Sequence, residues 1–512
     1  MRITSKYLII PVNPQAQRKK VLFYDKDGRL VYDFDAQLDA LTPMYSMYYD
    51  MARFMGMELS VSVEPEMDIA FAMTDTKPMA GVYNSCLRPT VHFTAAYGWI
   101  NDPNGLVYHD GVYHLYFQHN PMGACWGNMH WGHATSPDLI HWTECDLALY
   151  PDETGTMYSG SGIVDTKNAS GLSPEGKTIL FYYTAAPQNS RLSEEGDKKY
   201  VQCLAYSTDG GKTLTKYEGN PVVQWIEDGN RDPKVVWCEE LGVYLMALYI
   251  ARDEYQLFES DDLITWKNLQ TIRIPESSEC PDFYPLTADD GERKWVFTDA
   301  DEIYAVGHMD AASRQFVIDN EAKKFHYGTN SYAAQTYSGI PDRCVKIAWH
   351  TVTKTGTQFC CEMGIPMEIS LVNVNGEYYM KALPVAELDG IVRRTDTYSG
   401  VKKTPLSKTA AHDITIKVPK DSEDFTLTVF GSTFEVKPSE NLFSFGDKAM
   451  PISRTDGDVE IRLITDTVSV ECFLDGGLVY AVFGNILDKN LNYLTVTTDK
   501  AEITVKELMN IH

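Results

Sequence analysis

Short runs that alternate hydrophobic and polar residues cover most of this chain, and turn residues separate them. Residues 20–24 and 30–34 flank an Asp-Lys-Asp-Gly turn at 25–28, and residues 57–63 form another such run. Alternation with a period of two, interrupted by Gly-bearing turns, is typical of β-strands. Residues 1–85 are therefore expected to form a small β-sandwich-like domain.

A longer pattern repeats five times between residues 90 and 385. In each unit a polar motif opens a hydrophobic strand, a turn follows, and a second hydrophobic strand returns, at intervals of roughly 50 to 70 residues. The run SPDLIHW at 136–142 is echoed by SDDLITW at 260–266, and STDG at 207–210 lies in the unit between them. This pattern predicts a five-bladed β-propeller. Its strand pairs are expected at 101–107 and 113–118, 159–164 and 179–185, 231–237 and 244–250, 280–286 and 294–298, and 331–337 and 345–349.

Beyond residue 385 the alternating runs become shorter, which favours a second β-sandwich over residues 395–512. The predicted fold class is thus all-β: an N-terminal β-rich domain at 1–85, a five-bladed propeller at 90–385 and a C-terminal sandwich. The strands expected in the last segment are 412–418, 425–429, 459–465, 468–473, 478–483 and 494–498.

Size and charge limit the functions that such a fold can serve. A chain of 512 residues is too long for one core, and its 44% hydrophobic residues are enough to fill several. Its formal net charge of -26 disfavours nucleic acid and anionic membranes, which bind clustered Lys and Arg. A neutral small molecule such as a sugar fits better.

Cysteine usage and hydropathy predict a cytoplasmic protein without a metal. The apolar run at 7–10 is too short for the core of a signal peptide, and no later run approaches the length of a membrane span. The ten cysteines form no CxxC pair or regular framework, so free thiols in a reducing compartment are expected. The histidines form no ligand spacing with them, and neither a metal nor a cofactor is implied.

The propeller prediction places three carboxylates together. The first strand of each blade lines the central axis, so residues at the same end of these strands converge on one funnel. Asp102, Asp232 and Glu279 all occupy that position, and so do Ser159 and the segment 331–335. Unpaired like charges brought together destabilise a fold, so their convergence indicates a functional site.

Several motifs carry a resemblance to a known family. They occur in the order WINDPNG at 99–105, GNMHWGHA at 127–134, YSGS at 158–161, RDP at 231–233 and ECPD at 279–282. In this order they resemble the motifs of the glycoside hydrolase family that contains invertases, inulinases and levanases. Residues 461–471 are similar to the family's C-terminal module, so the resemblance covers residues 90–512.

The resemblance implies roles for individual residues. Asp102 would be the nucleophile, Glu279 the general acid/base and Asp232 the transition-state stabiliser, while Arg231 would steady the charge of the cluster. Trp349 also lies in a hydrophobic strand and is equally compatible with a place in the core. Further substrate-binding residues implied by the resemblance are Asn101, Gln118, Ser159, and an aromatic wall of Trp126, Tyr158 and Trp349.

Three positions depart from the family pattern. Ser278 precedes the acid where many members have an aromatic residue, Tyr158 replaces the usual Phe, and Met367 stands where Arg is common. These departures bear on the substrate subclass and on the width of the pocket, and not on the reaction.

The implied function is that of a retaining, exo-acting β-fructofuranosidase that hydrolyses terminal fructose from sucrose or fructo-oligosaccharides through a covalent fructosyl-enzyme intermediate. Two alternatives stay open: a fructosyltransferase of the same family, and a catalytically silent fructan-binding propeller. A homo-oligomer is compatible with the Met- and Tyr-rich run at 44–57, although core filling is the commoner use of such residues.

Overall fold

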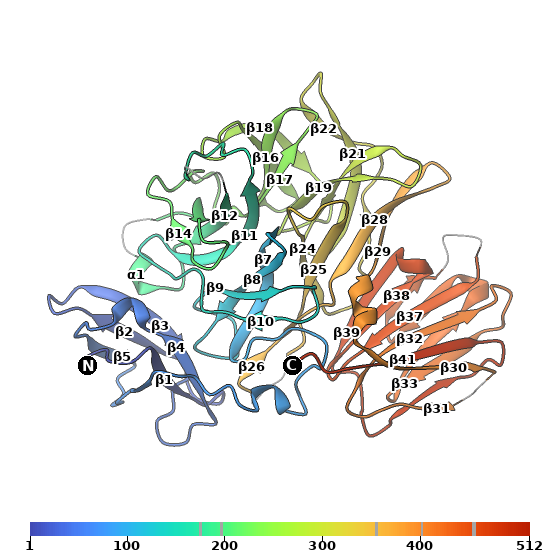
Figure 1. The fold of residues 1–512 in the computed structure, drawn as a ribbon, viewed down its shortest axis with the longest axis horizontal. Coiled ribbons are helices and arrows are strands. Elements are labelled where there is room, and N and C mark those ends of the chain that lie inside the picture. The colour runs from blue at the N-terminus through green and yellow to red at the C-terminus, as the bar shows by residue number, and fades with distance from the viewer. Residues whose placement is uncertain (174–176, 195–197, 354–356, 401–402, 453–456) are drawn as a thin grey trace.

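The computed structural model describes residues 1–512 except 174–176, 195–197, 354–356, 401–402 and 453–456, and it is nearly all β (Figure 1). The prediction of an all-β fold is confirmed. No helix among the described residues is long and apolar enough to cross a bilayer. The described helices are α1 (Arg191–Glu194) and the 3-10 turns η1 (Ala52–Phe54), η2 (Val82–Asn84), η3 (Ala386–Ile391), η4 (Pro438–Glu440) and η5 (Asp475–Gly477).

The N-terminal residues form two three-stranded antiparallel sheets that share one hydrophobic core. The predicted hairpin around the turn at 25–28 is present, and the apolar run at 7–10 belongs to a strand. The core also takes in Tyr97 and Met122 from the next segment. The sheets are β4-β1-β6, with β1 (Tyr7–Val12), β4 (Tyr45–Asp50) and β6 (Ala72–Thr74), and β3-β2-β5, with β2 (Lys19–Tyr24), β3 (Leu30–Ala36) and β5 (Ser60–Glu64).

Five sheets follow, and each contains four antiparallel strands in chain order. All five strand pairs predicted from the sequence are present. The strands of the first three sheets are β7 (Gly98–His109), β8 (Val112–Asn120), β9 (His130–Ser136) and β10 (Thr143–Glu144); β11 (Thr156–Asp165), β12 (Thr178–Ala186), β13 (Val201–Ser207) and β14 (Thr215–Lys216); and β15 (Arg231–Cys238), β16 (Val243–Ala251), β17 (Glu254–Ser260) and β18 (Lys267–Arg273).

The last two of these sheets take extra short strands: β23 pairs with β21, and β27 pairs with β25, while β26 joins the first sheet by parallel pairing with β7. The strands of the last two sheets are β19 (Asp282–Thr287), β20 (Arg293–Thr298), β21 (Ile303–Asp310), β22 (Gln315–Ile318) and β23 (Lys323–Lys324); and β24 (Ser331–Thr336), β25 (Cys344–His350), β27 (Glu362–Met363), β28 (Met367–Val374) and β29 (Glu377–Pro384). Strand β26 of the first sheet is Phe359–Cys360.

The first strands of the five sheets are neighbours in a cycle. Strand β7 contacts β11, β11 contacts β15, β15 contacts β19, β19 contacts β24, and β24 contacts β7. Inner strands such as β12 are buried at every position, because other strands cover both of their faces. The ends of the first strands are thereby brought to one place in the molecule.

The sequence echoes mark equivalent loops. In the first three sheets, the loop that follows the third strand begins with Ser-x-Asp, and the serine hydroxyl donates to the aspartate in each case. The same local hydrogen bond therefore closes each loop. The pairs are Ser136 and Asp138 at 3.1 Å, Ser207 and Asp209 at 2.7 Å, and Ser260 and Asp262 at 3.1 Å.

The C-terminal residues form two six-stranded sheets around a separate core (Figure 1). Along β34 buried and exposed residues alternate, as expected for a strand with one face on this core. The sheets are β30-β41-β32-β37-β38-β39 and β31-β40-β33-β34-β35-β36, with bounds β30 (Val392–Ser399), β31 (Lys403–Pro405), β32 (Ala411–Val418), β33 (Phe425–Val429), β34 (Ser432–Lys437), β35 (Leu442–Phe445), β36 (Lys448–Pro451), β37 (Val459–Thr465), β38 (Ser469–Leu474), β39 (Val479–Gly484), β40 (Tyr493–Val496) and β41 (Glu502–Leu508).

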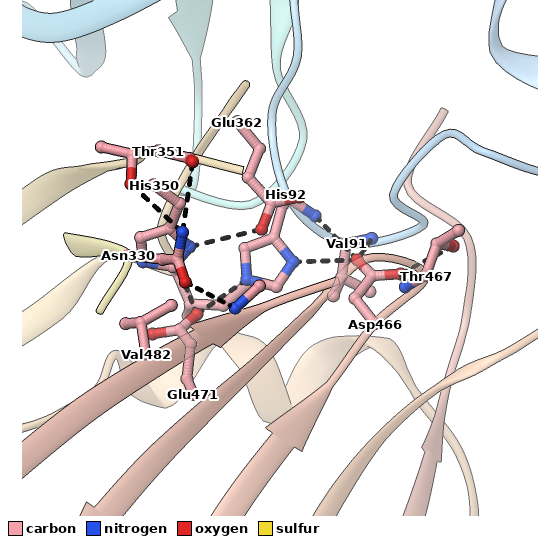
Figure 2. A network of polar contacts seen from close by, with 12 residues as sticks. Val91, His92, Asn330, His350, Thr351, Glu362, Asp466, Thr467, Glu471 and Val482 are labelled. Atoms are coloured by element: carbon pink, nitrogen blue, oxygen red, sulfur yellow. Dashed lines mark hydrogen bonds and ion pairs between the residues drawn. The ribbon is translucent and has the colours of Figure 1, made fainter. Parts of the chain in front are cut away.

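A buried polar network joins the central sheets to the C-terminal sheets (Figure 2). His92 Nδ1 lies 2.9 Å from Asp466 Oδ2, and His92 Nε2 lies 2.7 Å from Glu471 Oε1. Burial alone would lower the pKa of His92, but the surrounding carboxylates raise it well above its usual value. His92 is therefore a buried cation between two carboxylates of the C-terminal sheets.

Candidate active site

A pocket of about 390 Å³ lies where the first strands of the central sheets converge. All ten residues predicted for the site line it, together with three that were not predicted as site residues. The predicted residues are Asn101, Asp102, Gln118, Trp126, Tyr158, Ser159, Arg231, Asp232, Glu279 and Trp349, and the others are Met129, Tyr200 and Tyr332.

Irregularities in four first strands lie at the pocket. The pairing register shifts between Ile100 and Pro103 in β7 and between Met157 and Gly160 in β11, so that Asp102 and Ser159 fall inside a bulge. Similar shifts occur in β15 around Asp232 and in β24 beside Tyr332. A β-bulge re-aims side chains that regular pleating would direct along the strand faces. The bulges thus turn residues from separate sheets toward one space.

Left-handed backbone conformations occur at the same place. Asp232, Glu279 and Cys280 have φ values of 64°, 51° and 35°, in the left-handed region that non-glycine residues rarely occupy. Such conformations cost about 1–3 kcal/mol each and persist where the surrounding structure fixes them. Their occurrence at two of the three carboxylates fits a functional site better than a structural turn.

Asp102 is held by hydrogen bonds from two neighbours. Ser159 Oγ donates to Asp102 Oδ2 at 2.6 Å, and Asn101 Nδ2 donates to Oδ1 at 3.1 Å. Trp99 Nε1 donates to Asn101 Oδ1 at 2.9 Å and orients that amide. Burial and the nearby charge of Glu279 raise the pKa of Asp102 despite these hydrogen bonds, which favour its ionised form.

Asp232 lies deep in the cluster. Burial raises its pKa to about 7. The charge of Arg231 lowers this pKa, and the neighbouring carboxylates of Asp102 and Glu279 raise it. The backbone N–H of Cys280 donates to Asp232 Oδ2 at 3.1 Å. Cys280 Sγ lies 3.4 Å from this oxygen and 3.6 Å from Asp102 Oδ2, between the two carboxylates.

Glu279 is more accessible to solvent than Asp232, and two side chains hold its carboxyl group. Its side chain is 34% exposed, compared with 8% for Asp232. Arg231 Nη2 lies 2.5 Å from Oε1, and the Tyr332 hydroxyl donates to Oε2 at 2.8 Å. The Arg231 guanidinium is itself placed over the Tyr249 ring, 4.7 Å from its centroid. A carboxyl group in this position can reach a leaving group that departs toward solvent.

Two groups of aromatic rings form the walls of the pocket. On one side, Tyr158 meets Trp126 edge to face at 6.3 Å and Tyr200 at 6.0 Å. On the other side, Trp349 packs edge to face with Trp99 at 5.8 Å and with Tyr332 at 6.3 Å. Trp349 also packs against the core, so it lines the pocket and fills the core at once.

Two of the three additional residues lie in segments that the sequence singled out, and Met129 belongs to the motif at 127–134. Tyr332 lies in the segment expected at the head of the fifth unit, but its contact with Glu279 depends on the bulge in β24. Tyr200 and Met129 belong to no strand. Of the positions that depart from the family pattern, Tyr158 lines the pocket and Met367 is buried in β28.

Gln118 makes a structural contact as well. Its side-chain amide nitrogen donates to the Met157 carbonyl at 2.9 Å and ties β8 to β11 beneath the pocket. The residue is only 2% exposed. Its replacement would therefore disturb the floor of the pocket in addition to any contact with a ligand.

One group among the described residues has side-chain atoms close enough to share a metal ion: His92, His350 and Glu471, within 4.8 Å of one another. It lies at the contact with the C-terminal sheets (Figure 2), and none of its three residues lines the carboxylate pocket. Carboxylates already bond both ring nitrogens of His92, as expected for an imidazolium. The group is accounted for as an ion-pair network.

Three carboxyl groups that converge between aromatic walls can supply the acid and the nucleophile that glycoside hydrolysis requires. Residues 92–382, more than half of the chain, match the model of the glycosyl hydrolases family 32 N-terminal domain. The chain therefore belongs to glycosyl hydrolases family 32. The resemblance inferred from the motifs is confirmed, as is the prediction of a glycoside hydrolase.

Curated relatives agree with this assignment, and a solved structure shares the fold. The chain is 30% identical to a levanase from Bacillus subtilis, with 77% of this chain and 66% of the levanase covered, and 38% identical to an invertase from Schizosaccharomyces pombe, with 74% and 66% covered. It thus spans just under two thirds of both relatives. The structure of exo-inulinase from Aspergillus awamori superposes with a TM-score of 0.75 at 23% identity, and covers 84% of this chain and 100% of the inulinase.

Proposed function

We propose that the protein is a retaining, exo-acting β-fructofuranosidase that hydrolyses terminal fructose from sucrose or short fructo-oligosaccharides. The observation that carries this proposal is the pocket in which Asp102, Asp232 and Glu279 meet from three sheets. The names of the relatives support a fructose-containing substrate, and the chemistry of two differently placed carboxyl groups supports glycoside hydrolysis.

In the first step, Asp102 attacks the anomeric carbon of fructose and forms a covalent fructosyl-enzyme. Ser159 and Asn101 hold its carboxylate by the hydrogen bonds described above, so that one face is directed at the sugar. Glu279, at the more open side, protonates the oxygen of the leaving group. The leaving sugar then departs while fructose stays bonded to Asp102.

In the second step, Glu279 takes a proton from water as the water attacks the fructosyl-enzyme, which releases fructose and restores Asp102. Arg231 and Tyr332 keep Glu279 in place through both steps. Asp232 binds ring hydroxyls and stabilises the positive charge that develops on the sugar in the transition state.

Pocket dimensions support removal of one terminal unit. A volume of about 390 Å³ is at the small end of the range for ligand sites, about 300–1,000 Å³. A larger cleft of about 810 Å³ adjoins it, and Tyr332 lines both. The rest of an oligosaccharide would occupy this cleft, on the side of Glu279 from which the leaving group departs.

We also infer the finer architecture. The cycle of contacts among the five first strands supports a five-bladed β-propeller at about 90–385, flanked by a β-sandwich-like domain at 1–85 and a β-sandwich at 395–512. Ten free cysteines support a cytoplasmic location, because a reducing compartment preserves thiols.

A fructosyltransferase is the second candidate, and one observation favours it: the cleft beside Glu279 has room for an acceptor sugar in place of water. Product analysis tests both. The purified protein is incubated with high sucrose and with short inulin-type and levan-type oligosaccharides, and all products are quantified. The proposal predicts free fructose as the main product. Longer oligosaccharides with little free fructose would favour the transferase, and no turnover of any substrate would favour a fructan-binding protein.

A further inference from the structure

Two segments at the rim of the catalytic pocket rest on the N-terminal sheets. The first is residues 121–130, which carry Trp126 between β8 and β9. The second is residues 187–194, which follow β12. Gln188 in this segment accepts a hydrogen bond at 3.0 Å from the hydroxyl of Tyr200, which lines the pocket. Both segments contact the hairpin of β2 and β3 or the residue that precedes it. The family model begins at residue 92, so this support lies outside the matched domain.

Asp33 of β3 anchors the second segment. Its side chain is fully buried, and it accepts hydrogen bonds from Ser190 Oγ at 2.6 Å and from the backbone N–H groups of Arg191 and Leu192 at 3.0 and 3.1 Å. Lys20 balances its charge at 3.2 Å. A buried carboxylate that accepts three hydrogen bonds at the start of a short helical turn fixes the path of the chain there.

The same hairpin supports the first segment. Arg18 Nη2 donates to the Trp126 carbonyl at 3.2 Å, and the backbone N–H of Asp35 donates to Asn128 Oδ1 at 2.8 Å. Asn128 returns a hydrogen bond from Nδ2 to the Asp35 carbonyl, also at 2.8 Å. Met122 is completely buried in the N-terminal core. The loop with Trp126 is thus fixed at both ends and at its tip.

The two supported segments contribute to one wall of the pocket, which consists of three aromatic rings. Trp126, Tyr158 and Tyr200 form one wall, in which Tyr158 stands between the other two. Tyr158 belongs to β11, whereas Trp126 lies on the first segment and the hydroxyl of Tyr200 donates to Gln188 of the second segment at 3.0 Å. A wall for the apolar face of a sugar requires the rings to keep their places before the ligand arrives.

We propose that the N-terminal domain completes the sugar-binding wall, and that Asp33 is a positioning residue that sets the affinity for the fructosyl substrate by holding Tyr200 beside Tyr158. The inference rests on the proposed function for the identity of the substrate. Asp33 lies outside the pocket and touches none of the three carboxylates, so its effect falls on binding and not on the breaking of the glycosidic bond.

The test compares three variants by steady-state kinetics on sucrose and on a short fructo-oligosaccharide. Asp33→Asn should raise KM about fivefold to tenfold with kcat within about twofold of wild type, because hydrogen bonds to a charged group are lost. Ser190→Ala removes one of the three donors and should raise KM about twofold to threefold. Asp25→Asn is the matched control, since the Asp25 side chain accepts hydrogen bonds from the backbone N–H groups of Asp27 and Arg29 within its own turn.

Calorimetric unfolding and circular dichroism establish that each variant is folded. An unchanged KM in folded Asp33→Asn, a loss confined to kcat, or an equal rise of KM in Asp25→Asn would each overturn the inference. If Asp33→Asn does not fold, Ser190→Ala decides by the same criterion. If the wild type releases no fructose, the proposed function fails instead. Titration calorimetry of fructose binding to wild type and to Asp33→Asn then tests the inference separately. About fivefold weaker binding by the variant supports the inference, and equal affinity overturns it.

Discussion

Replacing Asp232 with asparagine should make the protein more stable at neutral and alkaline pH while it lowers activity strongly. The folded protein holds this carboxyl with a pKa of about 7, whereas the unfolded chain holds it near 3.8. Below pH 3.8 the group is protonated in both states and contributes nothing. As the pH rises toward 7, the Asp232 carboxyl ionises in the unfolded chain but stays protonated in the folded protein. Ionisation stabilises the unfolded chain, so the free energy of unfolding falls.

The size of the effect follows from the shift. About three pKa units at 1.36 kcal/mol per unit give an upper limit of roughly 4 kcal/mol above pH 7. Part of this is lost in the variant, because Arg231 gives up a contact of 3.7 Å with the carboxylate. The amide oxygen of asparagine can still accept from the Cys280 N–H. We therefore expect a gain of about 1–3 kcal/mol at pH 8 that disappears near pH 4.

Calorimetric unfolding of wild type and Asp232→Asn between pH 4 and 8 measures this, with the difference in Tm as the readout. Asp282→Asn is the control: this buried carboxylate pairs with buried Lys234 at 2.8 Å, and its loss should destabilise by about 3–5 kcal/mol. The kcat/KM of Asp232→Asn should fall about a hundredfold or more. The reasoning is refuted if Asp232→Asn melts below wild type at pH 8, or if the difference in Tm does not change with pH.

Three further substitutions probe other parts of the molecule. Gln118→Ala should weaken binding of the transition state by about 1–3 kcal/mol, measured as a fall in kcat/KM. An unchanged kcat/KM in the folded variant would leave Gln118 a purely structural role. His92→Gln should destabilise by about 3–5 kcal/mol, because it leaves Asp466 and Glu471 buried without their cation. The loss of stability in His92→Gln should be largest between about pH 4.5 and 6.5. The raised pKa of His92 stabilises the fold below pH 6.5, and the lowered pKa values of the two carboxylates stabilise it above pH 4.5. An unchanged Tm of the variant in this pH range would contradict this. Glu279→Ala should lose far more activity on sucrose than on a fructoside with an activated leaving group, and equal losses would exclude its role as the acid.

The sequence was sufficient for the repeating units and for the residues at the heads of their first strands. Alternation and turn spacing depend on local geometry, and the local motifs around Asp102, Asp232 and Glu279 are distinctive. The strand that begins at Tyr7 was missed because its partners lie far along the chain, and an isolated apolar run of this length does not define a sheet.

Contacts between distant segments could not be predicted. His92 lies 374 positions before Asp466, and no local pattern links them. The hydroxyl of Tyr332 reaches Glu279 only because β24 bulges beside it. The pKa of Asp232 likewise depends on burial and on charges from other sheets, which a single sequence does not reveal.

The central claim is that fructose passes to Asp102 before water takes it, and the stereochemistry of the first product tests this most directly. Two displacements at the anomeric carbon restore the original configuration, whereas a single displacement inverts it. NMR spectra recorded in the first moments of sucrose hydrolysis, before the sugar equilibrates, identify the anomer that is released. The account predicts β-fructofuranose. Initial release of the α-anomer would contradict a fructosyl intermediate on Asp102.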